Sequence, residues 1–184
     1  MRTKTEENHA PHTIHHFEAS RIRSSERHPR AVRAGIPAVE KRHLQIIREY
    51  GGTIEKTTLL EDSFAIRRLG RHRFSIAVPA HFGRKDTPYF YAVALGYLFV
   101  VMGYDTDVEE WSSSTVLYED EEYSLEHFLL AQYFALVLLM PADVFVAVVK
   151  SATYKGKCFV GEVADWFGLP APVVIERGRM LNLL

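Results

Sequence analysis

The stretch YFYAVALGYLFVVMGY, residues 89–104, decides the fold of this chain of 184 residues. It contains no charged side chain. Pro88 suits the first turn of a helix, and Gly103 suits its end. A second apolar stretch, SLEHFLLAQYFALVLLMP at residues 124–141, begins at a capping serine and is interrupted by its proline. The two stretches predict a pair of central apolar helices, buried in the core of one domain.

The flanking segments predict helices and a hairpin around this pair. IPAVEKRHLQIIREYGG, residues 36–52, has apolar side chains at helical spacing and two glycines that end the helix. SFAIRRLGRHRFSIAVPA, residues 63–80, alternates around a turn near Gly70 and predicts a hairpin of a small antiparallel sheet. Residues 142–152 predict a further helix, and residues 159–184 predict two short helices joined by GLPAP. The expected fold class is therefore α+β.

Composition separates a tail from the domain. Residues 1–36 are rich in His, Arg and Ser and poor in large apolar side chains, so we expect a disordered tail. Its histidines His9, His12, His15 and His16 could chelate a metal ion, but we favour a solvated flexible tail, because a stable zinc site needs ordered, converging ligands. Residues 37–184 form the predicted domain, in which residues 158–184 have the rhythm of a helix-turn-helix segment.

Charge is distributed unevenly along a chain whose net charge is −1. No Lys or Arg occurs between Asp86 and Val149, whereas eleven Asp and Glu residues do. Cys158 is the only cysteine and cannot form an internal disulfide, and the first 35 residues contain no apolar segment of a secretion signal. The apolar runs Pro88–Tyr104 and His127–Ala142 are shorter than the roughly 20 residues that span a bilayer. These features together predict a cytoplasmic protein.

The order of these elements resembles the ImmA/IrrE metallopeptidase family. In that family the first central helix carries AHELGH and the second carries EAN.FAAELLMP, where this chain has AVALGYLF from Ala92 and LAQYFALVLLMP from Leu130. The closing segment of the family resembles the positions Val163, Ala164, Phe167, Gly168, Leu169, Val173, Arg177 and Leu181. The resemblance covers residues 40–184 and implies a zincin-like core.

The positions that carry chemistry in the family are changed. An HExxH site needs two imidazoles one helical turn apart to hold zinc and a glutamate as general base. The resemblance places these groups at Val93, Ala94 and Tyr97, and a third ligand at Leu130. Val, Ala and Leu offer no lone pair to a metal. The sequence therefore predicts a pseudo-metallopeptidase with no metal, no cofactor and no enzymatic activity. We expect Val93, Ala94 and Leu130 to fill the space between the helices, and the Tyr97 hydroxyl to point toward a cleft or water.

Two alternatives keep some chemistry in the chain. His72, His81 and His127 lie near the expected core elements and could supply relocated ligands, although none forms a helical pair with another ligand. Cys158 follows Lys155 and Lys157, which could lower its pKa, although a buried structural thiol explains it as well.

The resemblance implies regulation by binding, because members of this family act on helix-turn-helix repressors of phages and mobile elements. A member without its metal could still bind such a repressor as an antirepressor. Acidic side chains could compete for the basic DNA-reading face of the repressor, or could only keep the domain soluble. The predicted partner-binding residues are Asp105, Asp107, Glu109, Glu110, Glu119, Asp120, Glu121 and Glu122.

DNA binding by the chain itself is the alternative function. The tail could make weak contacts with phosphates, and the helix predicted within APVVIERGRM could read DNA through Arg177 and Arg179. The tail arginines in question are Arg21, Arg23, Arg27, Arg30 and Arg33.

Overall fold

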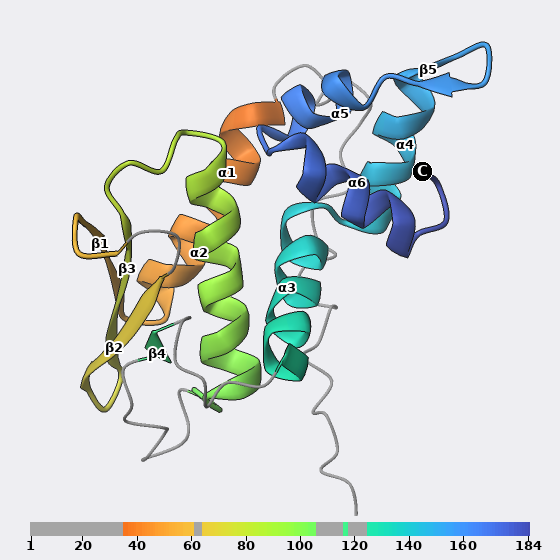
Figure 1. Ribbon diagram of the computed structural model, residues 1–184. Helices are drawn as coiled ribbons and strands as arrows, with labels where there is room; N and C mark the ends of the chain where they lie inside the picture. Colours follow the sequence, from red (N-terminus) through yellow and green to blue (C-terminus); the bar gives the residue numbers. More distant parts are fainter. Residues whose placement is uncertain (1–34, 61–63, 106–115, 118–124) are drawn as a thin grey trace, which may run out of the picture. The chain divides into compact units, whose positions relative to one another are not determined.

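The computed structural model describes residues 35–60, 64–105, 116–117 and 125–184, with side chains for residues 42–60, 64–105 and 125–184. Chain contacts divide the protein into two units, Met1–Arg33 and Ala34–Leu184, and the described residues belong to the second. The predicted disorder of residues 1–34 lies outside the described residues, whereas residues 35 and 36, which we also assigned to the tail, belong to a helix. The second unit combines helices with two small sheets, which confirms the α+β class (Figure 1).

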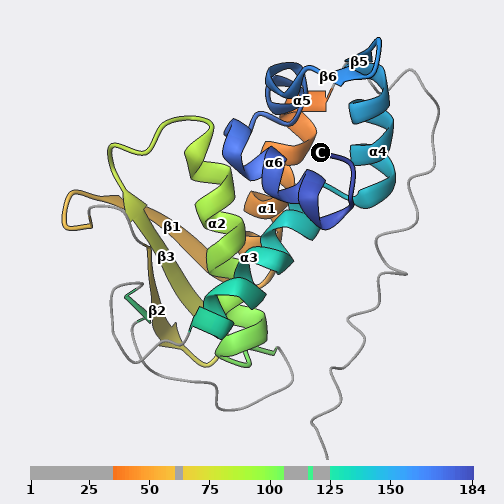
Figure 2. The ribbon, with the colours of Figure 1, turned by 45° about the vertical axis from the view of Figure 1, so that its right-hand side comes forward.

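The larger sheet contains strands β1 (Gly52–Thr57), β2 (Ala65–Gly70), β3 (Arg73–Pro79) and β4 (Val116–Leu117) in the order β1-β3-β2-β4. The predicted hairpin is confirmed, because β2 pairs antiparallel with β3. The alternating side chains of β3 and its partner β2 bury one face of the sheet against α2 (Figure 2). These core side chains are Ile66, Phe74, Ile76 and Val78.

The prediction of an antiparallel sheet was wrong for β1, which pairs parallel to β3. Within the described part of the larger sheet, β2 and β3 are joined by a tight turn. β1 pairs with the other edge of β3, and β2 comes between β1 and β3 in the sequence, which gives the longer connection that a parallel pair requires. The sheet is therefore mixed.

Two helices cover the inner face of this sheet. Helix α1 (Gly35–Glu49) ends at Gly51, whose φ of 80° lies in the left-handed region, as the glycine pair predicted. Helix α2 (Asp86–Gly96) continues without a break into the π-helical turn η3 (Tyr97–Val101), in which Met102 N donates to Tyr97 O over 2.8 Å. The chain then leaves the helix through Gly103, at φ 65°.

The second apolar stretch forms helix α3 (Leu125–Leu139), and helix α4 (Ala142–Ser151) follows after the break at Pro141. Among the described residues, no helix is long and apolar enough to cross a membrane alone. Taken together, α3 and α4 pass that test on length and composition, but they are bent by 65° relative to each other.

The C-terminal region lies beyond the C-terminal end of α3 (Figure 2). The short strands β5 (Thr153–Tyr154) and β6 (Lys157–Cys158) form a hairpin that the sequence analysis did not predict. Helices α5 (Val160–Phe167) and α6 (Ala171–Met180) confirm the two predicted helices and their connection.

Candidate functional site

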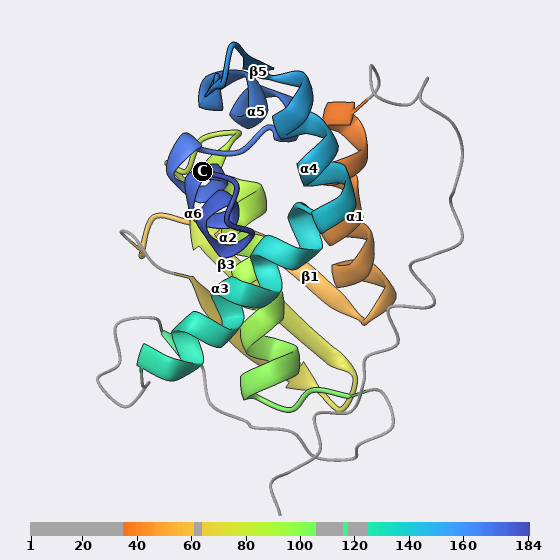
Figure 3. The ribbon, with the colours of Figure 1, turned by 90° about the vertical axis from the view of Figure 1, so that its right-hand side faces the viewer.

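Helices α2 and α3 contact each other beside the positions at which the family pattern places its reactive groups. Their backbones approach closely at Gly96 and Ala131. Figure 3 shows α3 crossing α2. A Cβ atom on Gly96 would lie 2.6 Å from the carbonyl oxygen of Ala131 and 2.8 Å from its Cα. Nearer the start of α2, Gln132 Nε2 donates to Tyr89 Oη over 2.9 Å. The two predicted central helices therefore form one closely packed pair.

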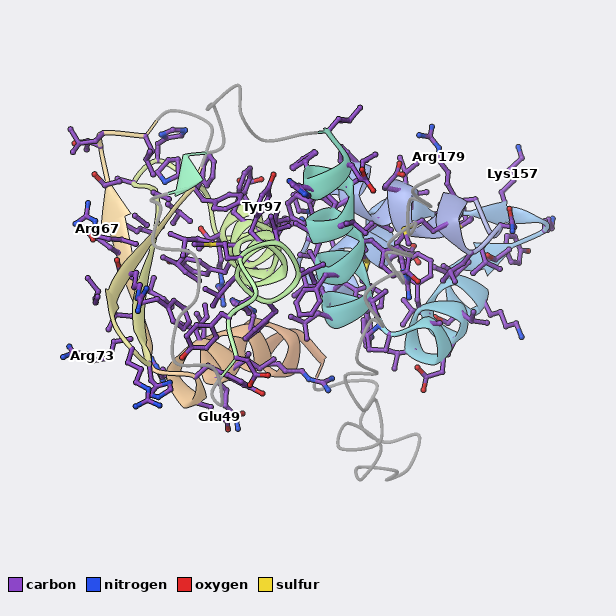
Figure 4. The ribbon with its side chains drawn as sticks, turned by 90° about the horizontal axis from the view of Figure 1, so that it is seen from below. Glu49, Arg67, Arg73, Tyr97, Lys157 and Arg179 are labelled. Carbon is purple, nitrogen blue, oxygen red and sulfur yellow. The ribbon has the colours of Figure 1, made fainter. Side chains whose placement is uncertain are left out.

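The three positions at which the family pattern places its reactive groups, two in α2 and one at the start of η3, are buried. Val93, Ala94 and Tyr97 are 1%, 0% and 1% exposed. The Tyr97 ring packs against Phe64, with 5.4 Å between ring centroids. Our expectation that the Tyr97 hydroxyl points toward a cleft or water was therefore wrong. Tyr97 is buried, and Phe64, from the chain just before β2, packs against its ring (Figure 4 labels Tyr97).

Leu130 does not behave as predicted. Its side chain is 43% exposed, so it does not fill the space between α2 and α3. The close contact is made one residue later, by Ala131, which is fully buried. Residues 130 and 131 are separated by about 100° around a helix, so one of them faces α2 while the other turns toward solvent.

These side chains do not fit a zinc ion. Aliphatic groups at Val93, Ala94 and Leu130 cannot coordinate a metal, and Tyr97 alone is an insufficient ligand set. His72 and His81 are exposed, His127 and Cys158 are half-buried, and the described part of the chain contains no group of three or more His, Cys, Asp or Glu placed to hold a metal. The structure therefore does not bring the candidate relocated ligands together.

Arg177 occupies a buried position that the sequence analysis did not predict. The side chain is 4% exposed, and its Nε donates to the Met140 carbonyl oxygen over 3.0 Å, at the end of α3. Burial lowers the pKa of the Arg177 guanidinium, and the neighbouring Tyr133 hydroxyl raises it. Arg177 is consequently not placed to read DNA, whereas Arg179 is exposed beside Glu176.

The turn between β2 and β3 gathers positive charge. Arg67, Arg71 and Arg73 are exposed, and His72 lies between the last two. Figure 4 shows Arg67 and Arg73 projecting from the sheet on the side away from α2. Exposed guanidinium groups on adjacent strands suit contact with an anionic surface.

Of the eight predicted partner-binding acidic residues, only Asp105 is described, and it is exposed. The other seven and the five tail arginines lie outside the described residues.

A surface that the sequence analysis missed lies on α3. Five of its large apolar side chains are 40–73% exposed, although we predicted a buried helix. Most of these side chains recur in the sequence at intervals of four residues. That spacing did not identify an exposed side, because apolar side chains occur on all sides of α3. We call the following residues the α3 stripe: Leu125, Leu129, Leu130, Tyr133 and Val137.

Comparison of the sequence with models of known protein families finds no match, and no curated protein matches it.

Proposed function

We propose that this protein is a non-catalytic relative of the ImmA/IrrE peptidases, with a zincin-like core formed by α2, α3 and the sheet, and that it regulates by binding another protein. The observation that carries the proposal is the packing of α2. Val93, Ala94 and Tyr97 are buried apolar or aromatic side chains where the family has its ligands and base, and Gly96 contacts Ala131 directly. Such packing keeps the scaffold and avoids the cost of burying unliganded His and Glu side chains.

The partner we propose is a helix-turn-helix repressor of a phage or mobile element. Such a repressor has a basic surface that contacts DNA phosphates. The segment Asp86–Val149 has no Lys or Arg and carries eleven acidic residues, so it offers the opposite charge. Binding by occupancy needs no bond to be broken, which agrees with the side chains at the former ligand positions.

The test first searches the neighbouring genes for a helix-turn-helix repressor and mixes that repressor with the purified full chain; the absence of any such gene would count against the proposal. We expect a complex in size-exclusion chromatography whose amount is the same in EDTA and in added zinc, and a repressor of unchanged mass by mass spectrometry. The complex should weaken as the salt concentration rises, because exposed charges are screened. Zinc-dependent shortening of the repressor, or the absence of any complex at low salt, would contradict the proposal. A variant in which His9, His12, His15 and His16 are replaced with Asn is the control for zinc bound by the tail. Zinc that the wild-type chain binds and this variant does not bind is held by these histidines.

Nucleic-acid binding is a second candidate function, favoured by the exposed arginines of the β2–β3 turn. If it holds, Arg67→Ala/Arg73→Ala should weaken binding to a random-sequence duplex in a gel-shift titration. The same variant should also make the slope of log K against log salt concentration shallower by about 2, roughly one unit for each lost phosphate contact. The control is Lys155→Ala/Lys157→Ala, which also removes two exposed charges but lies at the β5–β6 hairpin. It should leave the binding of the duplex by the β2–β3 turn unchanged.

The tail is tested separately, with a full chain in which its five arginines are replaced by alanine. If this variant loses all DNA binding and Arg67→Ala/Arg73→Ala loses none, the contact lies in the tail. That result would contradict a role for the β2–β3 turn.

A further inference from the structure

The α3 stripe is an apolar surface in a part of the protein that is otherwise closely packed. At about 100° per residue, its five members fall within an arc of roughly 140°. The opposite side of α3 is buried, with Ala131 and Ala135 0% exposed and Leu139 1% exposed. In Figure 3, where α3 lies nearest the viewer, no described helix or strand covers its N-terminal half. One side of the helix thus completes the core, and the other exposes leucine, tyrosine and valine to solvent.

The spacing of the stripe is that of a helix-binding surface. Leu125, Leu129, Tyr133 and Val137 follow one another at intervals of four residues and form a ridge along α3. Ridges at this spacing fit the groove between the side chains of a second helix, and partner helices bind through apolar residues at similar intervals. Leu130 widens the ridge on one side.

Charge determines which helix fits. The acidic side chain of Glu126 is exposed within the same arc of α3, and Asp143 is exposed at the start of α4. No Lys or Arg occurs in the sequence from Asp86 to Val149. Arg177 lies near Tyr133, but it is buried and donates to the Met140 carbonyl oxygen, so it does not offer an exposed positive charge to a partner. A helix that binds here is therefore favoured if its borders carry Lys or Arg.

Two other occupants are disfavoured by the same charges. A second copy of this chain would bring two segments together that each carry eleven acidic residues and no Lys or Arg. A membrane surface is usually bound through Lys and Arg beside the apolar face, and α3 has neither.

We propose that the α3 stripe binds the apolar face of an amphipathic helix in a partner protein, and that this helix carries Lys or Arg along its borders. The inference deepens the proposed function, on which it rests for the statement that the protein works by binding another protein. It assigns the contact to α3.

The test uses a fluorescein-labelled 18-residue peptide of Leu and Lys, with the leucines at intervals of three and four residues, and a counterpart with Glu in place of Lys. Binding to the full chain is measured by fluorescence anisotropy. The stripe variant is Leu129→Gln/Tyr133→Gln, which removes apolar surface without changing charge. The matched control is Leu59→Gln/Tyr154→Gln, which changes the same residue types at positions that are 90% and 65% exposed outside α3. All four positions are exposed, and circular dichroism verifies that both variants fold.

We expect the Lys peptide to bind the wild-type chain, to bind the stripe variant at least tenfold more weakly, and to bind the control within twofold of wild type. We expect the Glu peptide to bind at least tenfold more weakly than the Lys peptide. Equal binding of the two peptides would overturn the charge argument, and equal binding to the stripe variant and wild type would overturn the site.

Two further measurements test the two other possible occupants of the α3 stripe, a second copy of the chain and a membrane surface. Sedimentation velocity that shows a dimer lost in the stripe variant, with no peptide binding, would assign the surface to a second copy. Binding to vesicles of phosphatidylcholine and phosphatidylglycerol that is lost in the same variant, again with no peptide binding, would assign it to lipid. Either result would overturn the inference. Peptide binding through α3 combined with a repressor that forms no complex would leave the inference standing and refute the proposed function.

Discussion

Replacement of Gly96 with alanine should lower the free energy of unfolding by about 2–3 kcal/mol. The added Cβ atom would lie 2.6 Å from the Ala131 carbonyl oxygen and 2.8 Å from the Ala131 Cα. Both atoms belong to the backbone of α3, so the clash is relieved only by moving one helix away from the other. Alanine gains about 1 kcal/mol over glycine in helix propensity, which offsets only part of the loss. Urea unfolding, followed by circular dichroism, measures the change as a lower transition midpoint.

The matched control is Gly161→Ala in α5. A Cβ atom at Gly161 meets no other atom within 4 Å, so this variant should unfold at the wild-type midpoint or slightly above it. A second variant, Gly96→Ala/Ala131→Gly, should not recover stability, because the contacted atoms are not in the Ala131 side chain. Recovery in the double variant, or a Gly96→Ala midpoint equal to that of Gly161→Ala, would contradict direct packing of the two helices.

The helices were largely predictable because their ends are encoded locally. Gly51 ends α1 at a positive φ, and Pro141 separates α3 from α4. Gly168, at φ 66°, ends α5, and Pro170 stands at the start of α6. These residues restrict the backbone whatever surrounds them, so their effect can be read from the sequence.

The strands were less predictable because their signals are weak. β1 has the sequence GTIEKT, in which Ile54 is the only large apolar residue. The strand lies at the edge of the sheet and buries few side chains, so it needs few apolar residues. The β5–β6 hairpin consists of two-residue strands around Lys155 and Gly156, which are at φ 48° and 74°. Such a turn requires positive φ at both central residues, and lysine there gives little indication of it.

The site was predictable in its chemistry and not in its orientation. The absence of ligand side chains at Val93 and Ala94 is a property of the sequence alone. The exposure of Leu130 and of the α3 stripe is not, because α3 is apolar on all sides and its sequence does not indicate which side faces α2. That choice is made by tertiary contacts, including the fit of Ala131 against Gly96.

Replacement of Arg177 with alanine should lower the free energy of unfolding by about 2–3 kcal/mol. Its Nε donates to the Met140 carbonyl oxygen, one residue beyond the C-terminal end of α3, where a cation is also favoured by the helix dipole. Met140 and Arg177 are both buried, so alanine leaves an acceptor without its donor and a space where the guanidinium was. Thermal and urea unfolding of the full chain measure the loss.

The control for Arg177 is its neighbour Arg179, on the same helix and two residues away. Arg179 is exposed, and its ion pair with Glu176 is 3.7 Å long, so Arg179→Ala should change the free energy of unfolding by less than about 0.5 kcal/mol. Arg177→Met should cost less than Arg177→Ala, because methionine fills part of the volume that alanine leaves empty. Equal effects at positions 177 and 179 would show that α6 does not hold the end of α3. The break at Pro141 would then depend on other contacts, and the orientation that exposes the α3 stripe would be fixed by α2, η3 and α1.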